Sequence, residues 1–142
     1  MIDIIKWCER NLTKNDVFVD CGAHIGMIAI PVIASCSPRK SILIEGDKEA
    51  FKLLKANVDS FLSTEPVICF NEVLGNGEEM EFFATKNPAQ SSLYGVGRGG
   101  TTDLRKTTKL DDLLVDISGE IVMKLDIELA EPLAWEGMSN LL

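Results

Sequence analysis

The sequence predicts an α/β fold, a parallel sheet with helices on both faces, on the strength of three observations. Short apolar runs alternate with segments of helical periodicity along most of the chain. The run at 17–20 ends in an acid and leads into two glycines four residues apart, Gly22 and Gly26, which is typical of a strand that turns tightly into a helix. Because strands and helices alternate, we expect right-handed crossovers and parallel strands.

The first elements follow from this pattern. Residues 2–11 place apolar side chains three and four positions apart and predict an amphipathic helix that leads into the strand at 17–20. The next helix is expected over 26–35. Pro31 lacks a backbone donor and is tolerated only near the first turns of a helix, so this helix should begin late or be kinked.

Two further strands and one helix are expected before residue 72. Residues 41–45 form an apolar run that predicts a second buried strand, and residues 67–71 predict a third strand. Asp47 is a suitable N-cap for the helix between them. The apolar stripe of that helix is expected to consist of Phe51, Leu54, Val58 and Phe61.

The pattern changes after residue 73. Residues 80–85 and 101–107 can pair as a β-hairpin arm beside the main sheet, around a long loop at 86–100 that is rich in Gly, Ser, Asn and Pro. A short helix at 108–114, a fourth core strand at 121–126 and a helix at 130–142 complete the chain.

Composition limits the classes of function. A length of 142 residues fits one domain, here 1–142. With 14 basic and 22 acidic side chains, the net charge of −8 disfavours nucleic-acid binding. The longest apolar stretch, 25–36, is interrupted by Pro31 and is too short to span a membrane, and the N-terminus does not resemble a signal peptide, so we expect a cytoplasmic protein. The four cysteines include no C-x-x-C pair and predict no metal site.

The candidate site lies where the predicted strands end. Ligands of parallel α/β sheets bind at the carboxyl ends of the strands, and three strands end there in Asp20, Glu45 and Asp126. Glu45 follows Gly26 by 19 residues, a spacing typical of a carboxylate that accepts the hydroxyls of a ribose. The alternative, that these acids only cap helices, is weaker for several strands in register. The pattern therefore predicts a nucleoside site.

The identity of the nucleoside follows from the turn. The sequence has no third glycine of the dinucleotide motif, which disfavours an NAD-dependent oxidoreductase. An acid at position 20 would repel a diphosphate but suits a ligand with an ammonium or sulfonium group. S-adenosylmethionine carries both groups and a ribose, so it is the expected cofactor.

At this point four segments together resemble one family. They are Val-Phe-Val-Asp-Cys-Gly-Ala-His-Ile-Gly at 17–26, Ile-Glu at 44–45, Lys-Leu-Asp-Asp-Leu-Leu at 109–114 and the Lys-x-Asp-x-Glu-x-x-Glu signature within 121–131. In this order they resemble the FkbM-type methyltransferases. The resemblance implies a class I, Rossmann-like fold and S-adenosylmethionine-dependent O-methylation of a hydroxyl on a sugar or other small metabolite. It also implies that the C-terminal strands of the fold are missing from this chain.

The resemblance implies roles for individual residues. Asp126 is expected to act as the general base toward the acceptor hydroxyl and Glu128 to orient it, with no complete metal-ligand set. Ser92 and Glu131 are expected near the acceptor substrate. The cofactor-binding residues implied by the match and by the strand ends are Asp20, Gly22, Ala23, His24, Gly26, Glu45, Asn71 and Glu72.

Two departures from the family leave an alternative open. Leu129 replaces a glycine of the signature and is expected either to crowd the acceptor site or to strain the turn. The chain also stops early for this fold, which would leave the fourth strand as an open edge through which two copies could form a homodimer. An inactive fragment that only binds the cofactor is therefore the alternative to an active enzyme.

Overall fold

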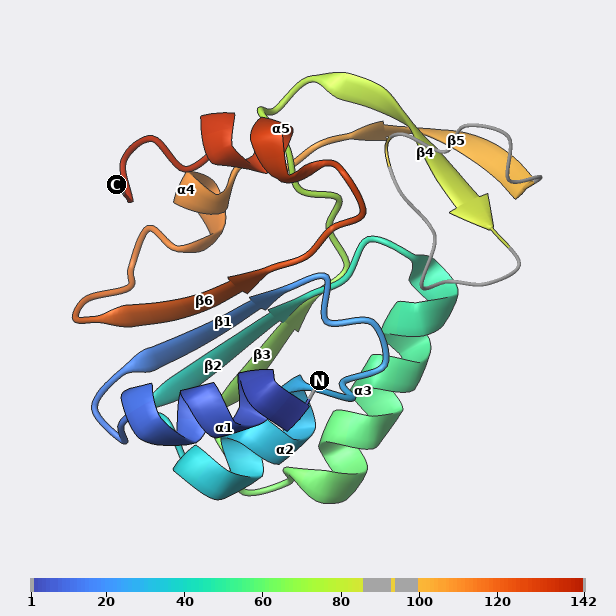
Figure 1. Cartoon of the computed structure of the whole chain (residues 1–142). Coiled ribbons are helices and arrows are strands. Elements are labelled where there is room, and N and C mark those ends of the chain that lie inside the picture. Colours follow the sequence, from blue (N-terminus) through green and yellow to red (C-terminus); the bar gives the residue numbers. More distant parts are fainter. Residues whose placement is uncertain (1, 86–92, 94–99, 142) are drawn as a thin grey trace.

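The core of the protein is a four-stranded parallel sheet. The computed structural model describes residues 2–85, 93 and 100–141. The strands lie in the order β3-β2-β1-β6, so the chain moves outward from β1 to β3 and then returns to the other side of β1 (Figure 1). Their bounds are β1 (Val17–Cys21), β2 (Lys40–Ile44), β3 (Val67–Phe70) and β6 (Ile121–Leu125). This order is that of half a doubly wound sheet, with the reversal between β1 and β6, and confirms the predicted Rossmann-like class.

Helices cover both faces of this sheet, as predicted. On one face lie α1 (Ile2–Asn11), α2 (Ala29–Cys36) and α3 (Lys48–Phe61), and on the other α4 (Leu110–Leu113) and α5 (Glu131–Glu136) (Figure 1). Side chains of β1 alternate between the two layers: Phe18 packs with the first group of helices, and Val17 and Val19 pack with the second. Burial on both faces explains why β1 is apolar almost throughout.

Local sequence explains where α2 and α3 begin. The carboxylate of Asp47 accepts hydrogen bonds from the backbone N–H groups of Glu49 (2.9 Å) and Ala50 (3.0 Å), so it caps α3 as expected. The helix α2 begins at Ala29 and not at residue 26, which places Pro31 in its first turn, where no backbone donor is needed. The expected late start is confirmed.

The last helix is shorter than predicted. The expectation of a helix over 130–142 is wrong beyond residue 136, because α5 ends at Glu136 and turns follow. Gly137 closes the helix and packs against the Gly75 carbonyl, where a Cβ would overlap. The backbone N–H of Asn140 then donates to the Asp111 carboxylate (3.1 Å), so a side chain replaces the helical acceptor.

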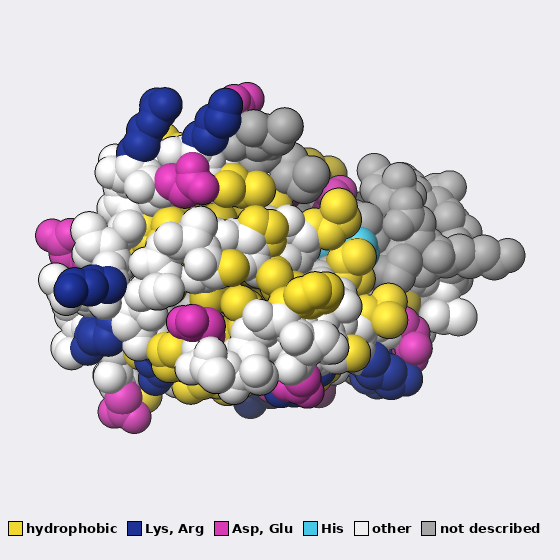
Figure 2. Space-filling view, turned by 90° about the horizontal axis from the view of Figure 1, so that it is seen from below, with side chains coloured by type: hydrophobic (Ala, Val, Ile, Leu, Met, Phe, Trp, Pro, Cys, Tyr) yellow, Lys and Arg dark blue, Asp and Glu magenta, His cyan; other side chains and the backbone are white. Residues whose placement is uncertain are grey.

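Several large apolar side chains on the helices are exposed. The core cluster under α1 and α3 contains Leu54 and Val58, but Phe61, the last residue of α3, is exposed, as are Trp7 on α1 and Trp135 on α5. Figure 2 shows apolar side chains on the helical face seen from below. Phe61 therefore does not extend the buried stripe, and the next residue, Leu62, is the one buried in this cluster.

The predicted hairpin arm is confirmed. Strand β4 (Glu79–Thr85) pairs antiparallel with β5 (Gly100–Lys106), and the pair forms a separate two-stranded sheet near the carboxyl ends of the parallel strands (Figure 1). An ion pair between Lys48 and Asp103 (3.5 Å) links the arm to the start of α3. Among the described residues, no helix has the length and apolar character needed to cross a membrane.

Candidate functional site

A cavity of about 250 Å³ lies at the carboxyl ends of β1, β2 and β6. It contains eight of the predicted site residues, while Gly26, Asn71 and Glu131 do not line it and Ser92 lies outside the described residues. The predicted residues in its wall are Asp20, Gly22, Ala23, His24, Glu45, Glu72, Asp126 and Glu128. Residues from four separate parts of the sequence therefore converge on one cavity at the point where the strand order reverses.

The glycine turn brings β1 and β6 close together. Gly22 has a φ of +80°, and a Cβ at this position would overlap the carbonyl oxygen of Asp126. The backbone N–H groups of Gly22 and Ala23 both donate to the Ile44 carbonyl (2.9 and 3.0 Å). These amides are used within the fold and do not form a phosphate cradle. Gly26 (φ +90°) allows close packing against α2 and α3 instead.

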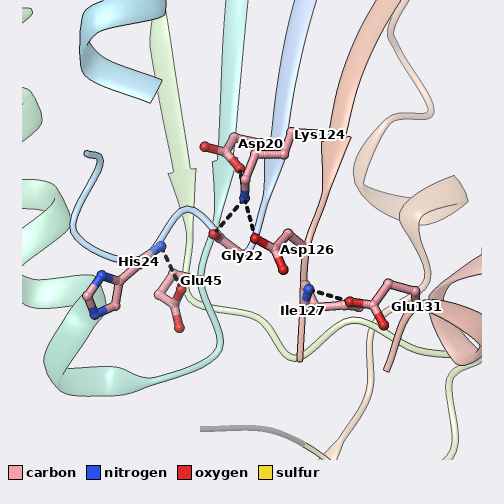
Figure 3. Close-up of polar contacts among 8 residues, drawn as sticks. All are labelled: Asp20, Gly22, His24, Glu45, Lys124, Asp126, Ile127 and Glu131. Carbon is pink, nitrogen blue, oxygen red and sulfur yellow. Dashed lines mark hydrogen bonds and ion pairs between the residues drawn. The ribbon is translucent and has the colours of Figure 1, made fainter. Parts of the chain in front are cut away.

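Glu45 is held firmly at the end of β2. Only 8% of its surface is exposed. One carboxylate oxygen accepts the backbone N–H of His24 (2.8 Å; Figure 3) and the other accepts that of Asp47 (2.7 Å). Burial raises the pKa of Glu45, and these two hydrogen bonds oppose that effect. Each carboxylate oxygen has a second acceptor site. The residue can therefore accept two hydroxyl groups from a sugar in the cavity without moving.

Lys124 is a site residue that sequence reasoning missed. Its ammonium group donates to Asp20 Oδ1 (2.9 Å) and to the Gly22 carbonyl (3.1 Å), and lies 3.8 Å from Asp126 Oδ2 (Figure 3). Asp20 is 1% exposed, and its Oδ2 is buried without a hydrogen-bond partner in the part of the chain described. Burial raises the pKa of Asp20 and Lys124 opposes this. The signal that could have revealed Lys124 is a charged residue within an otherwise apolar core strand.

The acids that follow β6 are arranged differently. The Asp126 side chain is 68% exposed, and Glu128 adopts a positive φ of +54° at the cavity wall. Glu131 accepts the backbone N–H of Ile127 (2.9 Å) and so closes this turn. Leu129 has a φ of +74° and an exposed side chain, so the departure from glycine strains the turn and does not crowd the cavity.

The residues that follow β3 contribute to the wall and to its support. Glu72 lines the cavity and accepts a hydrogen bond from the Thr108 hydroxyl (2.7 Å). The Asn71 amide donates to the carbonyl oxygens of Glu45 (2.8 Å) and Gly46 (3.3 Å), and therefore holds the loop after β2. His24 contributes its backbone, while its ring points away from Lys124 and Asp126 in Figure 3. Within the described ranges, no group of three or more His, Cys, Asp or Glu side chains is placed to hold a metal ion.

Comparison with known proteins gives likenesses to parts of larger structures. No protein-family model matches the chain, and no curated protein sequence matches it. TYW2 from P. horikoshii in complex with MeSAdo is 23% identical (TM-score 0.44), over 49% of this chain and 26% of that one. M. jannaschii TYW2 in complex with AdoMet is 26% identical (TM-score 0.43), over 52% and 36%. An rRNA methylase from Streptococcus thermophilus is 11% identical (TM-score 0.44), over 50% and 38%.

These likenesses cover well under half of each solved structure. The fold is defined by this chain's own strand order, β3-β2-β1-β6, and by the parallel pairing of these strands. The chain has a Rossmann-like α/β architecture, with its candidate site at the strand-order reversal.

Proposed function

We propose that this chain binds S-adenosylmethionine and transfers its methyl group to a hydroxyl of a sugar or other small metabolite. One observation carries the proposal: the glycine turn after β1 and the buried Glu45 after β2 meet at one cavity, with the carboxylate held by two backbone amides. A nucleoside whose ribose hydroxyls reach Glu45 fits this arrangement. The order of the FkbM-like segments supports the same family of reactions.

The electrostatics of the cavity favour a cationic ligand. Asp20, Glu45 and Glu72 all line it, and Lys124 is already paired with Asp20. The amides of Gly22 and Ala23 donate to Ile44 and are not available to a phosphate. A dinucleotide with a negative pyrophosphate would therefore find repulsion and few donors, whereas a sulfonium or ammonium group would be attracted. Asp20 Oδ2, which is buried and accepts no hydrogen bond from the described residues, also favours a ligand that donates hydrogen bonds.

The acids after β6 supply the remaining chemistry. When bound, S-adenosylmethionine provides an electrophilic methyl group, and its transfer forms a carbon–oxygen bond to the acceptor while the carbon–sulfur bond breaks and leaves its electron pair on sulfur. Asp126, at the exposed edge of the cavity, accepts the hydroxyl proton, and Glu128 orients the acceptor. General-base action of this kind contributes about 10²- to 10⁴-fold in rate.

Calorimetry with S-adenosylhomocysteine tests the proposal directly. The wild type should bind, Glu45→Gln and Glu45→Ala should weaken binding about tenfold or more, and the matched control Glu9→Ala on the exposed surface of α1 should not. Thermal unfolding of each variant separates lost binding from lost structure. Absence of wild-type binding, or binding of NAD in its place, would overturn the proposal.

Turnover separates an enzyme from a binding fragment. The wild type is incubated with S-adenosylmethionine and a panel of sugars and small alcohols, and the methylated product and S-adenosylhomocysteine are measured together. We expect both products in equal amounts. Binding without turnover on any acceptor would favour the cofactor-binding alternative.

We also propose a cytoplasmic location, where S-adenosylmethionine is available.

A second copy of this chain is proposed as the partner at the edge of the sheet. Among the described strands, β6 pairs with β1 alone, and all five of its residues are only half-buried. An open strand edge of this kind favours pairing with an identical edge. Light scattering at tens of micromolar protein should show a dimer. A monodisperse monomer would contradict this proposal and leave the proposed activity untouched.

A further inference from the structure

The hairpin arm contributes an aromatic side chain to the cavity. Phe82 of β4 is 6% exposed, lines the cavity and packs in one apolar cluster with Val73, which follows β3, and Ala130, which follows β6. Its neighbour Phe83 points to the opposite side of the strand and does not line the cavity. The sequence predicted the arm only as an addition beside the sheet, so the role of Phe82 is visible only in the fold.

The ring of Phe82 lies beside the backbone that follows β2. Gly46 directly follows Glu45 and has no side chain to form a wall there. A Cβ built on Gly46 would lie 3.3 Å from Phe82 Cε2 and 3.2 Å from Val73 Cγ2. The edge of the aromatic ring therefore lies beside the backbone that follows the ribose-binding carboxylate.

One residue of β5 ties this ring to that backbone. Arg105 donates from Nη1 to the Gly46 carbonyl (3.4 Å), and its guanidinium carbon lies 5.8 Å from the centre of the Phe82 ring. The second contact is within the range of a cation–π interaction. The Lys48–Asp103 ion pair fixes the same arm to the start of α3. Arg105 thus holds both the ring and the loop that the ring covers.

We propose that Phe82 forms the wall against which the base of the bound nucleoside packs, and that Arg105 is its positioning residue. This inference rests on the proposed function. The base of a nucleoside is joined to its ribose, so it lies next to the group that holds the ribose, and Phe82 and Val73 provide the apolar surface there. A heteroaromatic base packs favourably on such a ring. The hairpin arm is therefore part of the cofactor site.

Binding of S-adenosylhomocysteine to the full chain, measured by calorimetry, tests the role of Phe82. Phe82→Ala should weaken binding about tenfold or more, and Phe82→Leu, which keeps an apolar side chain, should weaken it by less. The matched control is Phe83→Ala, on the same strand and the other face, which should change the affinity by less than about twofold. Far-UV circular dichroism and thermal unfolding report whether each variant is folded. If Phe82→Ala does not fold, the affinities of Phe82→Leu and Phe83→Ala are compared instead, and weaker binding by Phe82→Leu would support the role of Phe82.

A double-mutant cycle tests the role of Arg105. Arg105→Ala alone should weaken binding about three- to fivefold, and its effect should be smaller in the Phe82→Leu background, because the part that acts through the ring is lost there while the hydrogen bond to the Gly46 carbonyl is not. If the wild type binds and the Phe82 variants behave like Phe83→Ala, this inference is wrong and the proposed function stands. If the effects of Arg105 and Phe82 are additive, Arg105 is not the positioning residue. If the wild type does not bind, the proposed function and this inference fail together.

Discussion

The two halves of the cavity hold their acids in different ways. At the ends of β1 and β2, Asp20 and Glu45 are almost fully buried, and each has a fixed partner: the Lys124 ammonium for the first, two backbone amides for the second. At the end of β6, the Asp126 side chain is 68% exposed, and the following turn has positive φ angles at Glu128 and Leu129.

The acids at the ends of β1 and β2 are held in fixed positions, whereas Asp126 after β6 lies at an exposed position. Buried and hydrogen-bonded groups keep one geometry and can recognise one ligand, whereas exposed groups on a strained turn lie where a second molecule must enter. The structure thus has a preorganised half that suits a constant cofactor and an open half that suits an acceptor. Four experiments test this contrast.

The largest effect is expected at the open half. Asp126→Asn should lower methyl transfer by about 10²- to 10⁴-fold because the proton of the acceptor loses its base. Its dissociation constant for S-adenosylhomocysteine should stay within about twofold of the wild type, since the ribose contact lies elsewhere. Rates are measured on the acceptor found in the panel, with exposed Asp116→Asn as the control. Unchanged turnover would remove Asp126 from catalysis.

The contact between the two halves should dominate stability. Gly22→Ala should lower the free energy of unfolding by on the order of 3 kcal/mol, because the new Cβ meets the Asp126 carbonyl and the backbone has a positive φ. Gly119→Ala is a matched control: its φ of +96° is similar, but among the described residues a Cβ there would meet only the end of the Arg39 side chain (3.2 Å). It should cost about 1 kcal/mol. Urea unfolding measures both, and equal losses would contradict the close approach.

The strained turn should respond in the opposite direction. Leu129→Gly should raise the free energy of unfolding by up to about 1 kcal/mol, because glycine adopts a φ of +74° without steric cost. Leu129→Ala keeps the Cβ and should bring no such gain. Urea unfolding of the two variants is compared directly. If the alanine variant is as stable as the glycine variant, the turn carries no strain.

A small effect of pH should distinguish the buried half. Burial raises the native pKa of Asp20 above its ordinary value of 3.8, and Lys124 partly offsets this. Between the pKa of the unfolded state and the higher native pKa, the native state binds more protons than the unfolded state. The contribution of Asp20 to stability is therefore present below about pH 4 and is lost as the pH rises through the native pKa. Asp20→Asn removes that slope. The free energy of unfolding of the wild type relative to Asp20→Asn should therefore decrease as the pH rises from about 4 through the native pKa of Asp20. A difference that does not change with pH would contradict this prediction.

Much of the fold follows from local signals. The turn after β1, the Asp47 cap and the late start of α2 each depend on residues within a few positions of one another. The cavity walls at Asp20 and Glu45 follow from the rule that parallel strands end at one edge. The exposure of Phe61 and the end of α5 could not be predicted in this way, because both depend on where a helix ends, and apolar periodicity does not determine that residue.

The strand–turn–helix units could be predicted from the sequence alone, since backbone conformation and short-range hydrogen bonds depend on neighbouring residues. The edge of the sheet at which their acids lie could also be predicted, because parallel strands end at the same edge. The side chains that complete the cavity, in contrast, are known only from the three-dimensional arrangement of the chain. Lys124 comes from a strand more than a hundred positions after Asp20, and Phe82 and Arg105 come from a hairpin outside the main sheet. Their contacts depend on packing between distant segments, which no local pattern encodes.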